Sequence, residues 1–136
     1  MPSLILIVDD DEAICRTLSL ALQGGGYDVL CAADARMAEQ LVDARQPDLI
    51  LTDIVMDEAD GLELINTILR VRKLSVPIVA MSGYAFANTE RAPDFLRMTI
   101  ELGAACCLRK PFTPNALLTS VNECLTRSIP GARLSQ

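Results

Sequence analysis

Histidine is absent from this chain of 136 residues. Its absence excludes a histidine general base, a metal site built on histidine and a role as a histidine phosphocarrier. The chemistry of this protein must therefore use carboxylates, hydroxyls, amines or thiols.

Long apolar segments are also missing. The longest early run, Leu4 to Val8, is too short for a membrane span or a secretory signal, and it lacks a basic flank. Hydrophobic residues make up 51% of the chain and charged residues 22%, which is typical of a globular protein. We therefore expect one cytoplasmic domain, over residues 1–127, that does not bind membranes. Residues 128–136, with Pro130 and Gly131, are expected to form a flexible tail.

Positive charge is scarce, since 12 lysines and arginines face 18 acidic residues and the net charge is −6. This excess of negative charge disfavours nonspecific binding to nucleic acid, and only a local basic patch could overcome it. We expect no direct nucleic-acid partner.

Cysteines are present but in the wrong pattern for a framework. Their number is odd and no two of them have CxxC spacing, which disfavours both a set of disulfides and a zinc site. Most are expected to be small buried side chains in a reducing compartment. They are Cys15, Cys31, Cys106, Cys107 and Cys124.

Short apolar runs alternate with segments of helical spacing along the whole chain. Continuous apolar strands separated by helices are typical of a parallel sheet covered on both faces. Right-handed crossovers then predict a doubly wound, five-stranded α/β fold, for which we choose the flavodoxin-like order 2-1-3-4-5. The expected strands are Leu4–Val8, Asp28–Ala32, Leu49–Thr52, Val76–Ser82 and Ala104–Leu108.

Helix-capping residues precede several of the intervening segments. Asp34, Asp60 and Thr113 are each suited to cap a helix, and Pro114 fits the first helical position after Thr113. Asp11 is more easily explained as a cap than as a metal ligand. These residues therefore predict where helices begin.

Polar residues follow four of the five expected strands. In a doubly wound sheet, ligands bind at the carboxyl ends of the strands, near the point where the strand order reverses. The expected order makes these four strands neighbours, so their polar ends meet at one edge. The residues are Asp9 and Asp10 after the first strand, Asp53 at the end of the third, Ser82 in the fourth and Lys110 after the fifth.

Three carboxylates at one edge repel one another, and a divalent cation relieves that cost. An all-oxygen site without histidine or thiolate suits Mg²⁺, which also accepts a phosphate oxygen readily. Lys110 would add a positive charge and Ser82 a hydrogen-bond donor beside Asp53. This combination favours phosphoryl transfer onto Asp53.

Four stretches, taken in order, resemble the response-regulator receiver domain of two-component signalling. They are "LILIVDDDE", "PDLILTDIVM" with Gly61 eight residues after Asp53, "MSGY" and "LRKPF". The resemblance covers residues 4 to 127, nearly the whole chain. It implies a protein that takes a phosphoryl group from a sensor histidine kinase or a histidine phosphotransfer protein and then changes its contacts with a downstream protein target.

The resemblance also implies roles for single residues. Asp53 would be the phosphoacceptor, and Asp9, Asp10, Asp53 and the backbone carbonyl of Val55 would hold Mg²⁺. Ser82 would be the switch hydroxyl and Lys110 the lysine that contacts the phosphoryl group, with a cis bond between Lys110 and Pro111.

Two residues depart from the family pattern. Asp57 stands where a proline is usual, and it adds an acid to the loop after Asp53. Cys107 replaces the aromatic residue that usually moves between buried and exposed positions, and a small thiol cannot bury a comparable area. Tyr84 is our candidate to take over part of the switching. The segment between Ser82 and Lys110 is longer than is usual in the family, and the extra length falls around Phe86 to Pro93.

Two other functions stay open. A Mg²⁺-dependent phosphohydrolase with Asp53 as nucleophile would want a second acid two residues on, where Val55 stands. A receiver-like interaction module that is not phosphorylated is suggested by Cys107 and Asp57. In either receiver interpretation we expect no DNA-binding module within the chain, which is either a stand-alone receiver or part of a larger protein. It would turn over no external metabolite, so we do not expect an enzyme in the usual sense.

Overall fold

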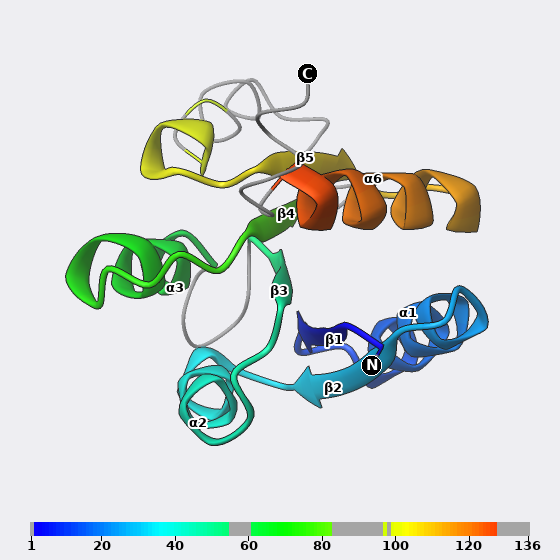
Figure 1. Cartoon of the computed structure of the whole chain (residues 1–136), viewed down its shortest axis with the longest axis horizontal. Helices are drawn as coiled ribbons and strands as arrows, with labels where there is room; N and C mark the ends of the chain where they lie inside the picture. Colours follow the sequence, from blue (N-terminus) through cyan, green and yellow to red (C-terminus); the bar gives the residue numbers. More distant parts are fainter. Residues whose placement is uncertain (1, 55–60, 83–96, 98, 128–136) are drawn as a thin grey trace.

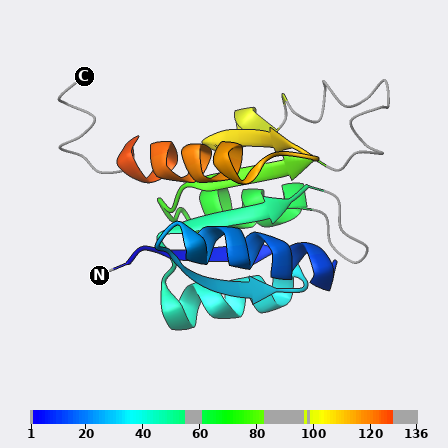
Figure 2. The same ribbon diagram turned by 90° about the vertical axis from the view of Figure 1, so that its right-hand side faces the viewer.

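The computed structural model describes residues 2–54, 61–82, 97 and 99–127. They form a parallel sheet of five strands in the order β2-β1-β3-β4-β5, which confirms the predicted topology. All strands run in the same direction, so their carboxyl ends lie along one edge of the sheet (Figure 2). The strands are β1 (Leu4–Val8), β2 (Asp28–Ala32), β3 (Leu49–Asp53), β4 (Ile78–Ser82) and β5 (Cys106–Arg109).

Helices cover both faces of the sheet (Figure 1). On one face α1 (Glu12–Gly24) and α6 (Pro114–Arg127) pack over Ile5, Ile7 and their neighbours, and on the other α2 (Ala35–Arg45) and α3 (Gly61–Asn66) pack over Leu6 and Val8. Successive residues of a strand point to opposite faces, so a strand covered on both faces must be apolar throughout. This is why β1, β3 and β4 read as continuous apolar runs.

Three of the predicted helix caps are confirmed. The Asp11 carboxylate accepts hydrogen bonds from the backbone N–H groups of Ala13 and Ile14 at 2.9 and 3.3 Å. Asp34 accepts one from Met37 N at 2.8 Å, and the Thr113 hydroxyl accepts one from Ala116 N at 3.0 Å. Each bond satisfies a backbone donor that the first turn of a helix leaves without an intrahelical partner. Asp60 lies outside the described residues.

Three element boundaries differ from the prediction. β4 begins at Ile78 rather than Val76, because Pro77 has no N–H for the ladder and contributes only its carbonyl, which accepts from Ile50 N at 3.0 Å. β5 runs from Cys106 to Arg109, and β3 includes Asp53.

The third helix also differs from a regular α-helix. After Asn66 it continues as a π-helix, η1 (Thr67–Val71), which the apolar spacing did not predict. Residues 97 and 99–102 are helical, as expected of the segment before Gly103, whereas Phe95 and Met98 lie outside the described residues. Among the helices that the structure describes, none has the length and apolar character needed to cross a membrane.

Candidate functional site

The carboxyl ends of β1 and β3 bring two acidic side chains together. Val8 and Thr52 are partners in the β1–β3 ladder, so Asp9 and Asp53 follow them side by side. Both residues are buried, with 2% and 7% of their surface exposed. Carboxylate oxygens of Asp9, Asp53 and the exposed Asp10 all lie within 4.8 Å of one another. The structure therefore gathers the three acids that the strand ends predicted.

Lys110 reaches this acidic cluster from the end of β5. Its Nζ lies 2.9 Å from Asp9 Oδ2 and 3.4 Å from Asp53 Oδ2. Burial by itself lowers the pKa of Lys110, but the hydrogen bond that its ammonium donates to Asp9 and the charges of Asp53 and Asp9 outweigh it, and the pKa is raised. The ammonium therefore stays charged, and it is shared between two carboxylates.

The backbone around Lys110 is set by the sheet. Its N–H donates to the carbonyl of Ser82 at 2.9 Å, in line with the pairing of Ser82 and Arg109 in the β4–β5 ladder. The Lys110–Pro111 bond is cis, as the family resemblance implied. Lys110 therefore reaches the acidic cluster from the end of β5, which is separated from β3 by β4.

Asp9 is held on several sides. Its backbone N–H donates to Ala32 O at 3.1 Å, and its Oδ1 accepts from Asp11 N at 2.9 Å. The thiol of Cys15 donates to the Asp9 carbonyl at 3.4 Å. Because Oδ1 is engaged by the backbone and Oδ2 by Lys110, the orientation of this carboxylate is well defined.

The backbone of Asp53 has two close neighbours that the sequence analysis gave no role. The Thr52 hydroxyl donates to the Asp53 carbonyl at 3.0 Å. Gly61 N donates to Ile54 O at 2.6 Å, and a Cβ atom on Gly61 would overlap the Asp53 carbonyl oxygen and lie 2.8 Å from Ile54 Cα. Gly61 was part of the family pattern, but only the structure shows that its lack of a side chain makes room for the Asp53 backbone.

Ser82 lies at the carboxyl end of β4 with 1% of its surface exposed. Within the described part of the chain, its hydroxyl oxygen makes no hydrogen bond. Buried polar atoms normally have partners, and leaving one without costs about 1–3 kcal/mol. The Ser82 hydroxyl can therefore donate a hydrogen bond to a group that binds at the carboxyl ends of the strands, where Asp53 also lies.

Of the remaining predicted site residues, the structure describes Cys107 but not Val55 or Tyr84. Cys107 lies half-buried in β5 against the side of the core that contains α2 and α3. Burial, together with the neighbouring Cys106, raises its pKa to about 11, so its thiol is neutral. Val55 and Tyr84 lie outside the described residues, as do Asp57 and the segment from Phe86 to Pro93.

The donor set of the acidic cluster fits a hard divalent cation. Its groups are all carboxylate oxygens, and the described chain places no nitrogen or sulfur ligand among them. Two of the carboxylates are fixed in position, while Asp10 is exposed and accessible to an ion from solvent. The residues present can therefore hold a metal such as Mg²⁺.

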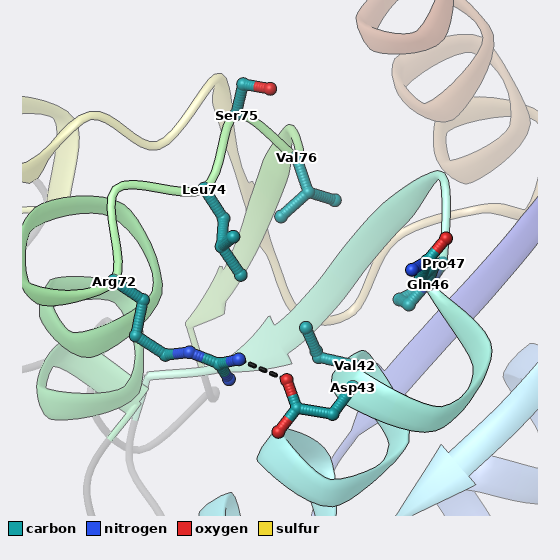
Figure 3. A pocket seen from close by; sticks show the side chains of 8 residues that line it. All are labelled: Val42, Asp43, Gln46, Pro47, Arg72, Leu74, Ser75 and Val76. Atoms are coloured by element: carbon teal, nitrogen blue, oxygen red, sulfur yellow. Dashed lines mark hydrogen bonds and ion pairs between the residues drawn. The ribbon is translucent and has the colours of Figure 1, made fainter.

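A hollow lies at the amino ends of β3 and β4, and Figure 3 shows the residues that line it. It has a volume of about 290 Å³ and lies between the end of α2 and the segment that leads into β4. Arg72 and Asp43 form an ion pair across it. The hollow is far along the strands from the acidic cluster, because it borders Pro47 and Val76, which precede β3 and β4.

A doubly wound sheet with an acidic cluster and a lysine at its carboxyl edge defines the class of receiver-like domains. The response regulator receiver domain matches residues 5–122, so the chain belongs to that family. Receiver domains of response regulators are not enzymes in the usual sense, and they act with kinases and downstream effectors.

Individual relatives agree with this assignment. The chain is 36% identical over 124 residues to the alkaline phosphatase synthesis transcriptional regulatory protein PhoP of Bacillus subtilis, covering 91% of this chain and 49% of that protein. It is 33% identical over 128 residues to the phosphate regulon transcriptional regulatory protein PhoB of Pseudomonas aeruginosa, covering 93% and 53%. The chain thus spans about half the length of these two curated relatives.

Solved structures show the same fold. The chemotaxis protein CheY4 of Vibrio cholerae superposes with a TM-score of 0.80 at 29% identity, covering 91% of this chain and 99% of that one. A CheY-like receiver domain protein of Methanospirillum hungatei superposes with a TM-score of 0.84 at 27% identity, covering 96% and 99%.

Proposed function

We propose that Asp53 accepts a phosphoryl group from the phosphohistidine of a sensor histidine kinase or a histidine phosphotransfer protein. The observation that carries the proposal is the pair of buried carboxylates, Asp9 and Asp53, that share the ammonium of Lys110 at the carboxyl edge of the sheet. Phosphoryl transfer depends mainly on positioning and on charge stabilisation, and both are supported by this arrangement.

In the proposed step, a carboxylate oxygen of Asp53 attacks phosphorus. The O–P bond forms while the P–N bond of the donor breaks, and its electron pair stays on the histidine nitrogen. The donor ring, which carries a proton on its other nitrogen, leaves as neutral imidazole. The Lys110 ammonium, now 3.4 Å from Asp53 Oδ2, would follow the negative charge onto the phosphoryl oxygens. Slow hydrolysis of the acyl phosphate by water would reset the site, so the chain modifies only itself.

Mg²⁺ is the cofactor that we propose for the acidic cluster. When bound, it supplies positive charge that neutralises the carboxylates and the incoming phosphoryl oxygens. Asp9, Asp10 and Asp53 would hold it, together with the backbone carbonyl of Val55. Asp9 serves two groups in this scheme, because Lys110 already engages its Oδ2.

Switching would begin at Ser82. Its buried hydroxyl lacks a partner in the described chain, and a phosphoryl group on Asp53 would offer it a strong acceptor. Tyr84 and Cys107 are our further candidates for the switch, by which the domain over residues 1–127 would change its contacts with a downstream protein. We also propose a cytoplasmic location, which rests on membership of the family.

The decisive experiment is the intact mass of the protein after incubation with acetyl phosphate, with and without Mg²⁺. Wild type is expected to gain one phosphoryl group only with Mg²⁺, and Asp53→Asn is expected to gain none. Asp48→Asn is the matched control, since Asp48 immediately precedes β3 at its other end and its carboxylate accepts a hydrogen bond from Leu4 N.

Other outcomes would identify the competing functions. Steady release of phosphate from small phosphate esters would indicate a phosphohydrolase. A protein that takes up no phosphoryl group and whose NMR spectrum is unchanged by BeF₃⁻ with Mg²⁺ would be an interaction module without phosphorylation.

A further inference from the structure

Two cysteines from different elements lie next to each other beneath the acidic cluster. Cys15 is buried in the first turns of α1, with 7% of its surface exposed, whereas Cys31 in β2 is exposed. The thiol of Cys31 donates to the carbonyl of Cys15 at 3.9 Å, which places the two cysteines side by side. Ser19 joins them, because its hydroxyl lies 3.2 Å from Cys31 Sγ and donates to Cys15 O at 2.7 Å. The Ser19 hydroxyl thus bridges the Cys31 thiol and the backbone of Cys15.

A hollow opens directly onto this pair. It has a volume of about 470 Å³, and its lining includes both cysteines, Asp9 and Met37. A small oxidant can therefore reach Cys31 from solvent without any rearrangement of the chain. Cys124, by contrast, is buried on the inner face of α6 with 1% of its surface exposed.

The pair is connected to the proposed metal site through one hydrogen bond. Cys15 Sγ donates to the carbonyl of Asp9 at 3.4 Å, and the Asp9 carboxylate belongs to the acidic cluster. The S–H proton of Cys15 makes this bond, and the acceptor is the backbone of a residue in the acidic cluster. Any reaction that removes the proton also removes this bond to Asp9.

We propose that Cys15 and Cys31 form an oxidation site, in which a hydroperoxide converts the two thiols into a disulfide that links α1 to β2 and weakens Mg²⁺ binding at the acidic cluster. The disulfide stands independently, while its effect on Mg²⁺ rests on the proposed function. Disulfides of this kind in reducing compartments are typically transient and redox-sensing.

The reaction balances with hydrogen peroxide as the oxidant. The accessible sulfur of Cys31 attacks one peroxide oxygen as a thiolate, an S–O bond forms, and the O–O bond breaks to release hydroxide, which takes up the thiol proton as water. The sulfur of Cys15 then attacks the sulfenic sulfur, its proton passes to the leaving hydroxyl group, and a second water departs as the S–S bond forms. Two electrons pass from the two sulfurs to the peroxide.

The disulfide changes the surroundings of Asp9 in two ways. It removes the S–H donor from the Asp9 carbonyl, and it ties the start of α1 to a strand that pairs directly with β1. Loss of an outer hydrogen bond around a metal ligand typically costs about tenfold or more in metal affinity. We expect the dissociation constant for Mg²⁺ to rise about tenfold on oxidation.

Tryptic peptide mapping tests the disulfide. Trypsin cuts after Arg16 and Arg36, so a bond between Cys15 and Cys31 joins the peptides of residues 1–16 and 17–36. After treatment with peroxide and alkylation, wild type and Cys106→Ser are expected to yield the joined peptides, whereas Cys31→Ser is not. A product in which Cys31 carries only a sulfinic acid, or in which only the other cysteines are joined, would overturn the proposal.

A Mg²⁺ titration of the reduced and oxidised forms, followed by NMR, tests the link to the acidic cluster. Oxidation is expected to weaken Mg²⁺ binding in wild type and to leave Cys31→Ser unaffected, with dithiothreitol restoring the wild-type affinity. Equal affinities in the two redox states would overturn the link. A reduced protein that binds no Mg²⁺ would instead refute the proposed metal site, while the peptide map would still decide the disulfide.

Discussion

Carboxylates at the amino ends of the strands (the amino edge) differ in burial and spacing from those at the carboxyl ends (the carboxyl edge). At the amino edge, Asp48 accepts from Leu4 N at 2.7 Å, and Asp43 pairs with Arg72 while 63% of its side chain stays exposed. At the carboxyl edge, the side chains of Asp9 and Asp53 are only 1% and 11% exposed, and they share one ammonium. The same residue type is thus dispersed at one edge and concentrated at the other.

The difference separates dispersed acids that are screened by water from buried acids that lie close together. Each acid at the amino edge has a donor of its own, and water screens its charge. At the carboxyl edge, burial makes repulsion between carboxylates costly, and a shared lysine only partly offsets it. A second cation at this site would lower the remaining repulsion, which is the basis of the proposed Mg²⁺ site.

The largest expected effect comes from Gly61→Ala, which disrupts the carboxyl edge alone. The new Cβ would overlap the Asp53 carbonyl, so we expect the free energy of unfolding to fall by about 3 kcal/mol or more, together with loss of the phosphoryl adduct. Chemical denaturation measures the loss. Gly24→Ala is the matched control, since nothing lies within 4 Å of its Cβ, and it should be neutral or slightly stabilising. Equal stabilities would refute the close contact.

Lys110→Met should be the next most damaging substitution. Removal of the ammonium leaves the carboxylates of Asp9 and Asp53 buried beside each other without a shared positive charge. In the absence of Mg²⁺ we expect the free energy of unfolding to fall by about 2–3 kcal/mol. Added Mg²⁺ should restore part of the loss. Urea denaturation at two Mg²⁺ concentrations measures both effects, and a variant as stable as wild type would show that the acids do not depend on the lysine.

Mg²⁺ should stabilise the wild-type protein through the acidic cluster. A Mg²⁺ concentration about 100 times the dissociation constant adds about 2.7 kcal/mol to the free energy of unfolding, which thermal denaturation detects as a higher Tm. Asp9→Asn should abolish most of this increase, whereas Asp43→Asn at the amino edge should retain it. An equal Mg²⁺ response in both variants would place the metal elsewhere.

The stabilisation by Lys110 should depend on pH in the alkaline range. The pKa of Lys110 is raised in the folded protein, so its contribution is complete below the ordinary lysine value of 10.5 and is lost as the pH rises through the folded value. The difference in Tm between wild type and Lys110→Met should therefore narrow above pH 10.5. A difference that widens there would contradict the sign of the shift.

The smallest effect is expected at the amino edge. Arg72→Met breaks the ion pair with Asp43, whose side chain is largely exposed. We therefore expect the free energy of unfolding to change by at most about 1 kcal/mol and the phosphoryl adduct to be unaltered. Denaturation and intact mass measure the two quantities. A loss as large as that of Lys110→Met would remove the distinction between the two edges.

Much of the fold was predictable because its signals are local. Continuous apolar runs marked the strands, and Asp11, Asp34 and Thr113 marked the starts of helices, since a cap is satisfied within a few residues. The meeting of Asp9, Asp53 and Lys110 followed from topology, because parallel strands deliver their carboxyl ends to one edge. The roles of these residues in phosphoryl transfer stay predictions.

Long-range contacts decided the rest. The expectation that most cysteines are buried was wrong, because only Cys15 and Cys124 of the five are buried. Cys31 is exposed in β2, and Cys106 and Cys107 are half-buried in β5; these are the two outer strands of the described sheet, each paired with one neighbour. The π-helical turn after Asn66 was not predictable from apolar spacing.

The sequence by itself therefore determined the strands, the caps and the edge at which the acids gather, since each depends on residues that are close in the chain or on the order of the strands. Only the tertiary structure brought Gly61 against the backbone of Asp53, and Cys31 beside Cys15. Those contacts join elements whose relative positions are set by side-chain packing across the whole core, and no local pattern encodes them.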